Sequence, residues 1–447
     1  MTASTLRSDA PRTRVSLKWL WPLGALALVL ASLSQFIGPA VIPLGIASIT
    51  LLPMVWGILA GGIISGQRFR PFPVRLQSAA GSIMGIAVLV LVASLAFTIG
   101  PNVPLLFKAG PALLLQEVGH MLGTLVLALP LAVVLRMGPA TIGATFSIDR
   151  EGSFAIVSDK YGPESDQYRG VLSMYLFGTL FGALFISVLA SLMTSFKVFD
   201  PLALAMGAGV GSSSMMAAGA ASVASQYPGM KDQIFAVAAA SNVVTGPIGV
   251  YVAVWIALPL ADKIYHGMTS RFPALAGKDG QDLAPALTAG SIAAEVKSVL
   301  NVTKVPLTIS MPALTVIGII ISAIAAKSFS WNMVWGYLII DALILASIGL
   351  SRLCRGKVIS MVFIITLGTL LSSPISPIAS FLVSMVTSVN FLSITTVVLT
   401  FAGLSLGKDL PLLRRVGWRI IPVGLVAIAS SYLFSTFIAE LILRNWK

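Results

Sequence analysis

The chain contains few charged residues, few histidines and almost no cysteine. Of its 447 residues only 10% are charged, two are histidine and one, Cys354, is cysteine. A single cysteine excludes a disulfide framework and a cysteine-based metal site. No segment has the pattern of a nucleotide-binding loop, and no polar stretch is long enough to form a catalytic domain. We therefore expect neither an enzyme nor a resident metal or other cofactor, with Na⁺ considered only as a coupling ion.

Apolar residues take up most of the composition. Hydrophobic residues make up 57% of the chain and the mean hydropathy is +0.95, which is typical of an α-helical polytopic membrane protein. The first apolar run begins near Leu17 and is followed at once by another, as expected for a retained span and not for a cleaved signal peptide. The runs long enough to cross a bilayer, about 20 residues each, are 18–36, 40–63, 76–99, 111–136, 169–195, 201–226, 233–260, 305–326, 331–350, 358–372, 376–404 and 417–443.

Basic residues are concentrated in short loops, so the net charge of +13 indicates membrane orientation and not nucleic-acid binding. The positive-inside rule places these loops in the cytoplasm, together with the N-terminal tail. If only the apolar runs cross the membrane, two of these basic loops would lie outside the cytoplasm. One further crossing, through the polar segment Met137–Gly162, corrects this and gives about 12–13 crossings. The basic loops are 7–18, 68–75, 352–357 and 408–419.

Two short segments of the chain match each other. Gly100–Gly110 reads GPNVPLLFKAG and Gly407–Gly417 reads GKDLPLLRRVG. With the extra crossing, the first copy lies outside and the second inside. This predicts an inverted repeat, the usual architecture of a secondary transporter.

The segment Met137–Gly162 carries charges that cannot face lipid. We interpret it as a discontinuous helix that unwinds at Gly143, Ala144 and Thr145 and lines a protein-enclosed cavity. The second half-helix would favour an anion at its N-terminus, with Arg150 pairing a carboxylate. The alternative is an interfacial cytoplasmic turn. The candidate substrate-binding residues here are Thr145, Ser147, Asp149, Arg150, Glu151 and Ser153.

A second discontinuity is predicted in Gly207–Ala218, where three spaced glycines precede three serines within an apolar run. Glycine weakens a helix and serine favours the start of a new one. Ser212, Ser213 and Ser214 are therefore candidate ligand contacts. Packing of small residues between membrane helices is the alternative.

Four further positions are candidates for ion coupling or substrate contact. Asn242 and Thr245 precede a Gly-Pro pair that we expect to break its helix, where freed carbonyls could bind a cation; a simple proline kink is the alternative. Glu117 and His120 share one helix face and could bind substrate, carry a proton or contact the region of Arg150. Two ligands alone do not make a zinc site.

Asp341 is a further candidate for ion coupling, because it lies at the centre of an apolar run, where a charge is costly. It could alternatively lock two helices together. The segment Ser372–Ser380 is expected to be a tight turn, and the polar segment Ala261–Lys304 a cytoplasmic loop that contains a surface helix.

The segments from Ala140 to Gly162 and from Gly207 to Val254 resemble the core of the LrgB and CidB family. They are more distantly similar to the 2-keto-3-deoxygluconate permeases and bile-acid sodium symporters. The whole chain resembles an uncharacterised family of bacterial integral membrane proteins, on the motifs LLLQEVGH, IGATFSIDRE and GLSLGKDL. The resemblance implies an elevator-type carrier in the bacterial inner membrane, with a transport core (137–260) and scaffold helices (18–136 and 305–447) that often form a homodimer.

We therefore expect an all-α polytopic membrane protein with an inverted repeat, acting as an elevator-type secondary transporter of a small organic anion. The anion is expected to be a carboxylate, coupled to Na⁺ or H⁺. Two alternatives remain at this point. A cation/proton antiporter would use Asp149, Glu117 or Asp341 as its titrating group, and an LrgB-like membrane regulator would show no saturable transport.

Overall fold

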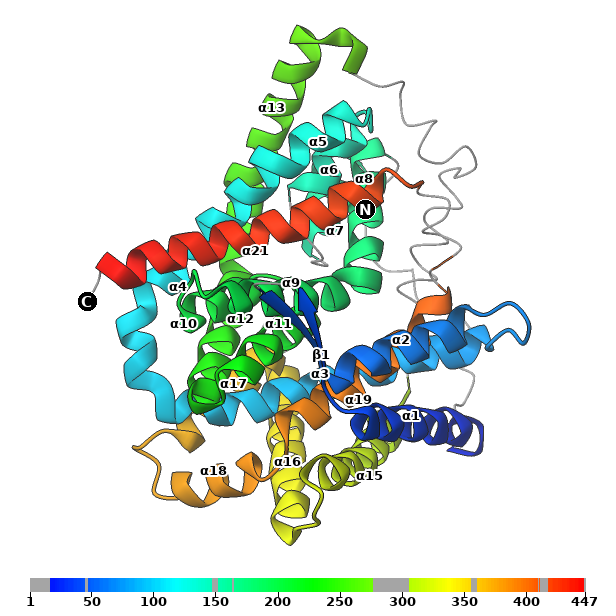
Figure 1. Cartoon of the computed structure of the whole chain (residues 1–447), viewed down its shortest axis with the longest axis vertical. Helices are drawn as coiled ribbons and strands as arrows, with labels where there is room; N and C mark the ends of the chain where they lie inside the picture. Colours follow the sequence, from blue (N-terminus) through cyan, green and yellow to red (C-terminus); the bar gives the residue numbers. More distant parts are fainter. Residues whose placement is uncertain are drawn as a thin grey trace, which may run out of the picture.

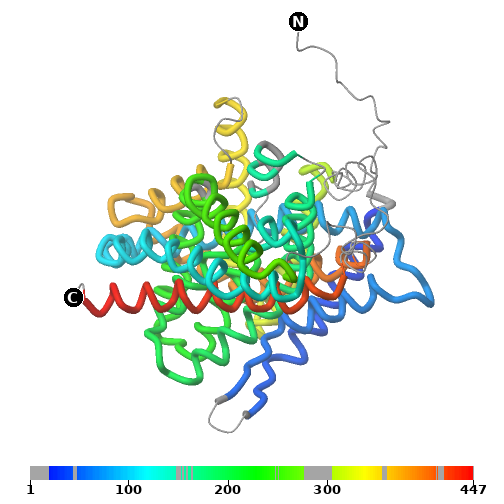
Figure 2. The backbone as a smooth tube through the Cα atoms, turned by 90° about the horizontal axis from the view of Figure 1, so that it is seen from above, coloured from blue at the N-terminus to red at the C-terminus, as the bar shows by residue number. Residues whose placement is uncertain are grey.

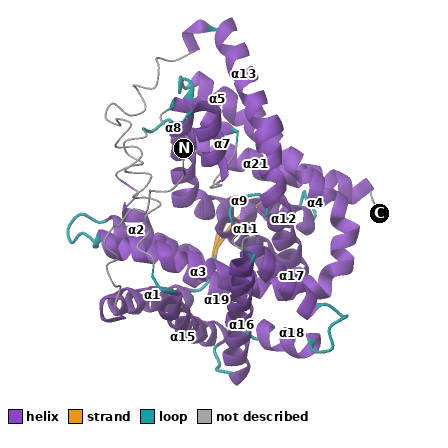
Figure 3. Cartoon of the chain, turned by 180° about the vertical axis from the view of Figure 1, so that it is seen from behind, coloured by secondary structure: helices purple, strands orange, loops and turns teal. Residues whose placement is uncertain are grey.

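The computed structural model describes residues 17–44, 47–146, 152–162, 165–275, 305–354, 360–408, 410 and 417–445. In these ranges the chain is a bundle of helices with one small β-hairpin (Figures 1 and 3). Seven helical stretches are long and apolar enough to cross a membrane: Leu20–Ile37, Val74–Val134, Asp166–Phe196, Leu307–Ala326, Trp331–Leu353, Phe391–Lys408 and Ile420–Asn445. A helical polytopic membrane protein is thereby confirmed, while further crossings stay a prediction.

The elements in chain order are as follows. They are α1 (Leu17–Ile37), β1 (Ala40–Leu44), β2 (Ala47–Leu51), α2 (Pro53–Gly66), α3 (Val74–Ile99), α4 (Val103–Gly123), α5 (Leu129–Val134), α6 (Ala140–Thr145), α7 (Gly152–Tyr161), α8 (Asp166–Phe177), α9 (Ala183–Phe196), α10 (Pro201–Ala208), α11 (Ser213–Gln226), α12 (Lys231–Val252), α13 (Leu258–Arg271), α15 (Leu307–Ala326), α16 (Trp331–Leu353), α17 (Ser360–Ser372), α18 (Ala379–Thr387), α19 (Phe391–Ser405) and α21 (Ile420–Asn445). Single π-helical turns join α4 to α5, α8 to α9 and α12 to α13 without a break; they are Thr124–Ala128, Gly178–Gly182 and Ala253–Ala257.

In two places a helix from the first part of the chain packs against a helix from the last part. α2 packs along α19, and α21 runs beside α4 and α5 (Figures 1 and 2). Glycines permit both contacts: a Cβ added at Gly61 would lie 2.8 Å from the Leu404 amide nitrogen, and one at Gly119 would lie 2.5 Å from the Phe434 carbonyl oxygen. Such close backbone approach through small residues is how helices associate in membranes, where no hydrophobic driving force acts between them.

The two copies of the sequence repeat follow helices that pack on each other. α3 precedes Gly100–Gly110, α19 precedes Gly407–Gly417, and α3 and α19 are in contact. α4, which begins within the first copy, is also in contact with α21, which follows the second copy. The first copy is itself mostly helical, because α4 begins at Val103. Most of the second copy lies outside the described residues.

The predicted helical span 40–63 is wrong at its start. β1 and β2 form an antiparallel hairpin there, and the helix begins only at Pro53. Pro43 cannot donate a helical hydrogen bond, and the valine, isoleucine and threonine around it favour strands. The amide of Thr50 donates to Ser191 Oγ on α9 over 2.7 Å, which holds the hairpin against the bundle.

The described residues of the segment Met137–Gly162 contain two short helices, α6 and α7. α6 continues through Gly143 and ends at Thr145, so the predicted unwinding at Gly143 is wrong. Gly143 serves helix packing instead: a Cβ there would lie 1.8 Å from the carbonyl oxygen of Gln167 on α8. Residues 147–151, between the two helices, lie outside the described residues.

The second predicted discontinuity is confirmed. α10 ends at Ala208, α11 begins at Ser213, and Gly209 to Ser212 form the break. The predicted turn at Ser372–Ser380 is also confirmed, since α17 ends at Ser372 and α18 begins at Ala379. The apolar run 376–404 is not one span, because α18 and α19 are separate helices.

The predicted break at the Gly-Pro pair Gly246–Pro247 is wrong. α12 continues through both residues and ends only at Val252. A proline inside a helix removes one hydrogen bond, and tight packing by neighbouring helices can tolerate this loss in a membrane protein. A proline within a continuous helix still leaves one carbonyl oxygen without its helical donor, so the cation site expected at this point stays a prediction.

Asp341 is paired within the helices that follow the predicted core. Thr315 Oγ1 on α15 donates to Asp341 Oδ2 on α16 over 2.6 Å. α16 packs mainly against α15, α17, α18 and α3. The pair is therefore a link between two neighbouring helices. Asp341 Oδ1 is buried without a hydrogen-bond partner among the described residues, so a role of Asp341 in ion coupling stays a prediction.

Replacing Thr315 with valine tests this link. We expect the free energy of unfolding to fall by about 1 kcal/mol, because a hydrogen bond between membrane helices contributes about that much. The replacement is nearly isosteric, so packing is preserved. Denaturation in mixed micelles would measure the change, and an unaltered stability would contradict a locking role for Asp341.

Candidate functional site

The break between α10 and α11 is held by polar side chains of α12. Asn242 Nδ2 donates to the carbonyl oxygens of Gly209, over 2.9 Å, and Gly211, over 2.8 Å. Ser213 Oγ donates to Asn242 Oδ1 over 3.2 Å. Thr245 Oγ1 makes a longer contact of 3.4 Å with the Gly209 carbonyl. Two groups that the sequence assigned to separate roles, the serines and Asn242 with Thr245, thus form one network.

The other side of the break presents the N-terminus of α11. Ser212 occupies the N-cap position with extended backbone, φ −66° and ψ 160°, but its side chain caps no backbone amide of the helix. Its hydroxyl instead lies 3.2 Å from the hydroxyl of Ser214. The first amides of a helix have no partner within the helix and carry its positive dipole end. This end of the break therefore combines hydroxyl groups with a partial positive charge.

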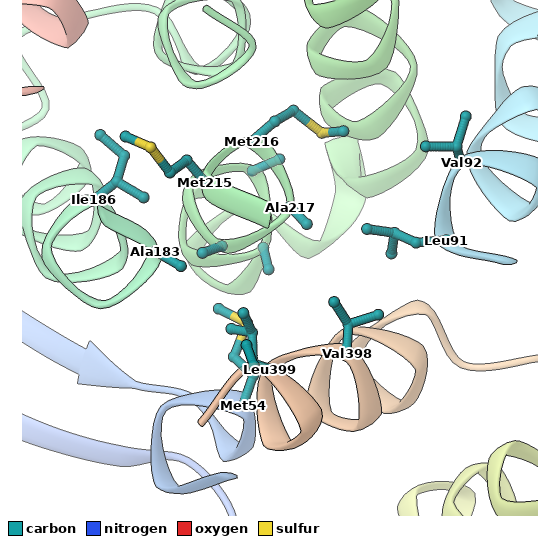
Figure 4. Packing of buried hydrophobic residues seen from close by; sticks show 14 of the residues in the cluster. Met54, Leu91, Val92, Ala183, Ile186, Met215, Met216, Ala217, Val398 and Leu399 are labelled. Carbon is teal, nitrogen blue, oxygen red and sulfur yellow. The ribbon is translucent and has the colours of Figure 1, made fainter. Parts of the chain in front are cut away.

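The first turn of α11 is fixed by the apolar core. Met215 and Met216 point away from each other into packed side chains, Met215 towards Ile186 of α9 (Figure 4). Both methionines are almost fully buried, with 4% and 1% of their surfaces exposed. Gly209 has no room for a side chain, since a Cβ there would lie 2.3 Å from Ser241 Oγ. Packing on both sides therefore fixes the break between α10 and α11.

Glu117 and His120 lie on α4, one turn before its π-helical segment. Both side chains are buried, with 3% and 5% exposed. They line a small cavity of about 10 Å³, which is close to the volume needed for one water molecule. Its other walls are Met121 on α4, Phe146 at the end of α6, and residues 249–257 of α12 and the π-helical turn after it. π-helical turns are frequent at functional sites.

Ser431 on α21 forms a hydrogen bond with Nδ1 of His120. No local pattern in the sequence predicts this partner, because Ser431 lies 311 positions from His120. Among the described residues no three acidic, histidine or cysteine side chains gather as a metal site would require.

A short relay joins the two clusters. Gln116 Nε2 on α4 donates to Ser241 Oγ on α12 over 2.7 Å. Ser241 in turn donates to the carbonyl oxygen of Met206 on α10 over 2.8 Å. Gln116 adjoins Glu117, and Ser241 adjoins Asn242. Two hydrogen bonds through the fully buried Gln116 and Ser241 therefore link α4, α12 and α10, at positions next to both clusters.

The remaining predicted residues are not shown to join this site. Thr145 and Ser153 are buried on α6 and α7, which pack against α8, and Thr145 Oγ1 donates within its own helix to the Thr141 carbonyl. Ser147, Asp149, Arg150 and Glu151 lie outside the described residues. Asp341 is held by Thr315.

Comparison with known families gives one match. A family model described as a protein of unknown function (DUF3100) matches residues 32–267, more than half of the chain. The chain belongs to the DUF3100 family. No curated protein and no solved structure matches it. The DUF3100 match includes both polar clusters on α4, α10, α11 and α12 but ends before α21, so Ser431 lies outside the matched range.

Proposed function

We propose that the chain is a secondary active transporter of a small organic anion, a carboxylate, coupled to Na⁺ or H⁺. The membrane-embedded helical architecture is compatible with this function. The proposal rests on the difference between the two ends of the α10–α11 break, since one end presents carbonyl oxygens and the other presents helix amides. Asn242 occupies the carbonyl end, at Gly209 and Gly211, whereas the Ser212 side chain leaves the amide end of α11 uncapped.

This polarity favours an anion over a cation. A cation at a broken helix is bound by released carbonyl oxygens, and here two of these accept hydrogen bonds from Asn242 Nδ2. An anion is bound by helix N-terminal amides and hydroxyl donors. Ser212 and Ser214 supply hydroxyls at the start of α11, while Ser213 donates to Asn242 Oδ1. Arg150, outside the described residues, is the side chain that the sequence predicts to neutralise a carboxylate. Alternating access would open this site to each side of the membrane in turn.

The mirrored helix contacts support an inverted repeat and an elevator-type movement. α3 and α19 precede the two sequence copies and pack together. α4, which begins within the first copy, packs on α21, which follows the second copy. Such self-pairing of corresponding helices is expected about a two-fold pseudo-symmetry axis in the membrane. In this proposal the scaffold helices also form a homodimer in the bacterial inner membrane, with the N-terminus in the cytoplasm.

A thermal-shift screen against carboxylates, with and without Na⁺, tests the proposal. A ligand that binds only the folded protein stabilises it by about 2.7 kcal/mol at 100 times its Kd, so a bound carboxylate is expected to raise Tm. Ser214→Asp should abolish this rise, because a fixed carboxylate in the first turn of α11 favours the helix but repels an anion.

The matched control is Asn332→Asp, which adds the same charge at the corresponding position of the first turn of α16. Asn332 is exposed and remote from the break, so the anion-dependent rise should remain. A rise that survives in Ser214→Asp would remove the break as the binding site. The absence of a rise with every carboxylate would contradict the proposed substrate class.

A cation/proton antiporter is the second candidate function, favoured by the buried pair Glu117 and His120. The antiporter and the anion transporter predict different results in the carboxylate screen. Stabilisation by cations or by pH alone, with no response to carboxylates, would support the antiporter.

A further inference from the structure

We propose that Glu117 and His120 form the proton-binding site of the transporter, so that the coupling ion is H⁺. The inference rests on the proposed function for its role in transport, although the site itself can be tested without any substrate. One proton would be held by the pair, and protonation of the pair would accompany binding of the anion at the α10–α11 break.

The partner of His120 suits a side chain that changes its protonation state. His120 Nδ1 is bonded to Ser431 Oγ, a hydroxyl. A hydroxyl can donate to a neutral imidazole nitrogen and can also accept from a protonated one. A backbone carbonyl could only accept, and would fix Nδ1 as a donor. Ser431 therefore satisfies His120 both before and after it gains a proton.

The backbones around this contact are held rigidly. Gly119 and Gly123 flank His120 on α4, and a Cβ at either position would lie 2.5 Å from the Phe434 carbonyl oxygen or 2.4 Å from that of Ser430. The two helices therefore cannot separate or slide here without losing close backbone contact. A proton gained by His120 has to be accommodated by side chains, and not by helix movement at this point.

The cavity gives the pair contact with a water-sized space. Glu117 and His120 share it with Phe146, the last described residue before the break between α6 and α7. A cavity of about 10 Å³ holds no organic substrate but is close to the size of one water molecule. A proton can move through a single water, whereas Na⁺ needs several oxygen ligands, and Glu117 is the one carboxylate side chain in the described lining. The lining of the space thus favours H⁺.

Several elements face the pair, and some of their residues lie outside the described ranges. α21 contributes the hydroxyl of Ser431, and residues 249–257 of α12 and its π-helical turn contribute no ionisable side chain to the cavity. The segment after Phe146 contains Asp149, Arg150 and Glu151, which lie outside the described residues. Among the candidates for ion coupling, Asn242 and Thr245 are engaged at the break, and Asp341 is engaged by Thr315.

The relay provides a route for coupling. Gln116, next to Glu117, donates to Ser241, and Ser241 donates to the Met206 carbonyl in the last turn of α10. Asn242, the next residue of α12, holds the break itself. A rearrangement at the α4 cluster is thus transmitted to the break through neighbouring residues of one helix. By linkage, a negative charge at the break should raise the proton affinity of the pair.

Infrared difference spectroscopy of the purified protein in lipid, during a pH titration, tests the site without a substrate. A protonated carboxyl group gives a C=O band that the carboxylate lacks. We expect Glu117→Gln to abolish one such band and Ser431→Ala to move its midpoint, while Asp341→Asn retains it. Circular dichroism and size-exclusion chromatography would show that each variant is folded. A band that persists in Glu117→Gln, or that disappears in Asp341→Asn, would overturn the site.

Coupling is tested with the same band. Ser214→Asp places a fixed negative charge where the anion is proposed to bind, and should move the midpoint to higher pH by about 1 unit, within the usual range of allosteric coupling. Asn332→Asp should leave it in place. An unmoved midpoint in Ser214→Asp would overturn the coupling. A positive titration alongside a failed carboxylate screen would retain the proton site and reject the anion transporter, so the two failures are distinguishable.

Discussion

Replacing Asn242 with leucine is expected to destabilise the protein by about 2–4 kcal/mol and to abolish stabilisation by anions. The substitution leaves the Gly209 and Gly211 carbonyls, as well as the Ser213 hydroxyl, without the amide that binds all three. Each buried polar group that loses its partner costs about 1–3 kcal/mol. The break is then free to close into a continuous helix, which would remove the exposed amides of α11.

Tm and denaturation in mixed micelles would measure the loss of stability, and the carboxylate screen would measure the loss of binding. Thr245→Ser is the matched control on the same helix. It keeps the hydroxyl that contacts Gly209 and should cost less than about 1 kcal/mol, the value of one buried methyl group. An Asn242→Leu protein that is as stable as the unmodified chain would show that the break does not depend on this side chain.

Replacing Gly143 with alanine is expected to have the largest effect on folding. The added Cβ would lie 1.8 Å from the Gln167 carbonyl oxygen and 2.7 Å from its carbon, both backbone atoms that cannot rotate away. Overpacking of a core costs about 1–3 kcal/mol and more where backbone must shift. We expect a loss of at least about 3 kcal/mol, because α6 would be displaced from α8.

Yield of monodisperse protein and Tm would report this effect. Gly85→Ala on α3 is the control, since a Cβ there meets nothing within 4 Å. Normal yield and Tm for Gly143→Ala would contradict the close packing of α6 on α8 and would restore Gly143 as a point of unwinding.

Sequence reasoning identified the features that composition determines locally. The spaced glycines before Ser212 predicted a break, and the structure has one there. The same reasoning misjudged Gly143, because a glycine that unwinds a helix and a glycine that admits a neighbouring backbone have the same appearance in a sequence. It also misjudged Gly246, which lies within the continuous helix α12. The hairpin before α2 was missed because its residues are as apolar as those of a span.

The partners of the candidate site could not be predicted from local pattern. Ser431 meets His120 from 311 positions away, and Gln116 appeared only as a neighbour of Glu117. The sequence indicates Asn242 only because of a break expected in its own helix, α12. In the structure Asn242 instead binds the carbonyls of the break between α10 and α11. Side chains that complete a site from distant helices leave no periodic signal, since their spacing is set by how helices cross.

The pairing of α2 with α19 also bears on how the protein is made. At about 5–20 residues per second, roughly 15–65 s elapse after the ribosome completes α2 before α19 follows. During that interval the glycine face of α2, including Gly57 and Gly61, has no native partner. Biogenesis therefore depends on a temporary companion for this short helix, such as lipid or the insertion machinery, and a chain shortened before α19 would not retain the N-terminal half in its native arrangement.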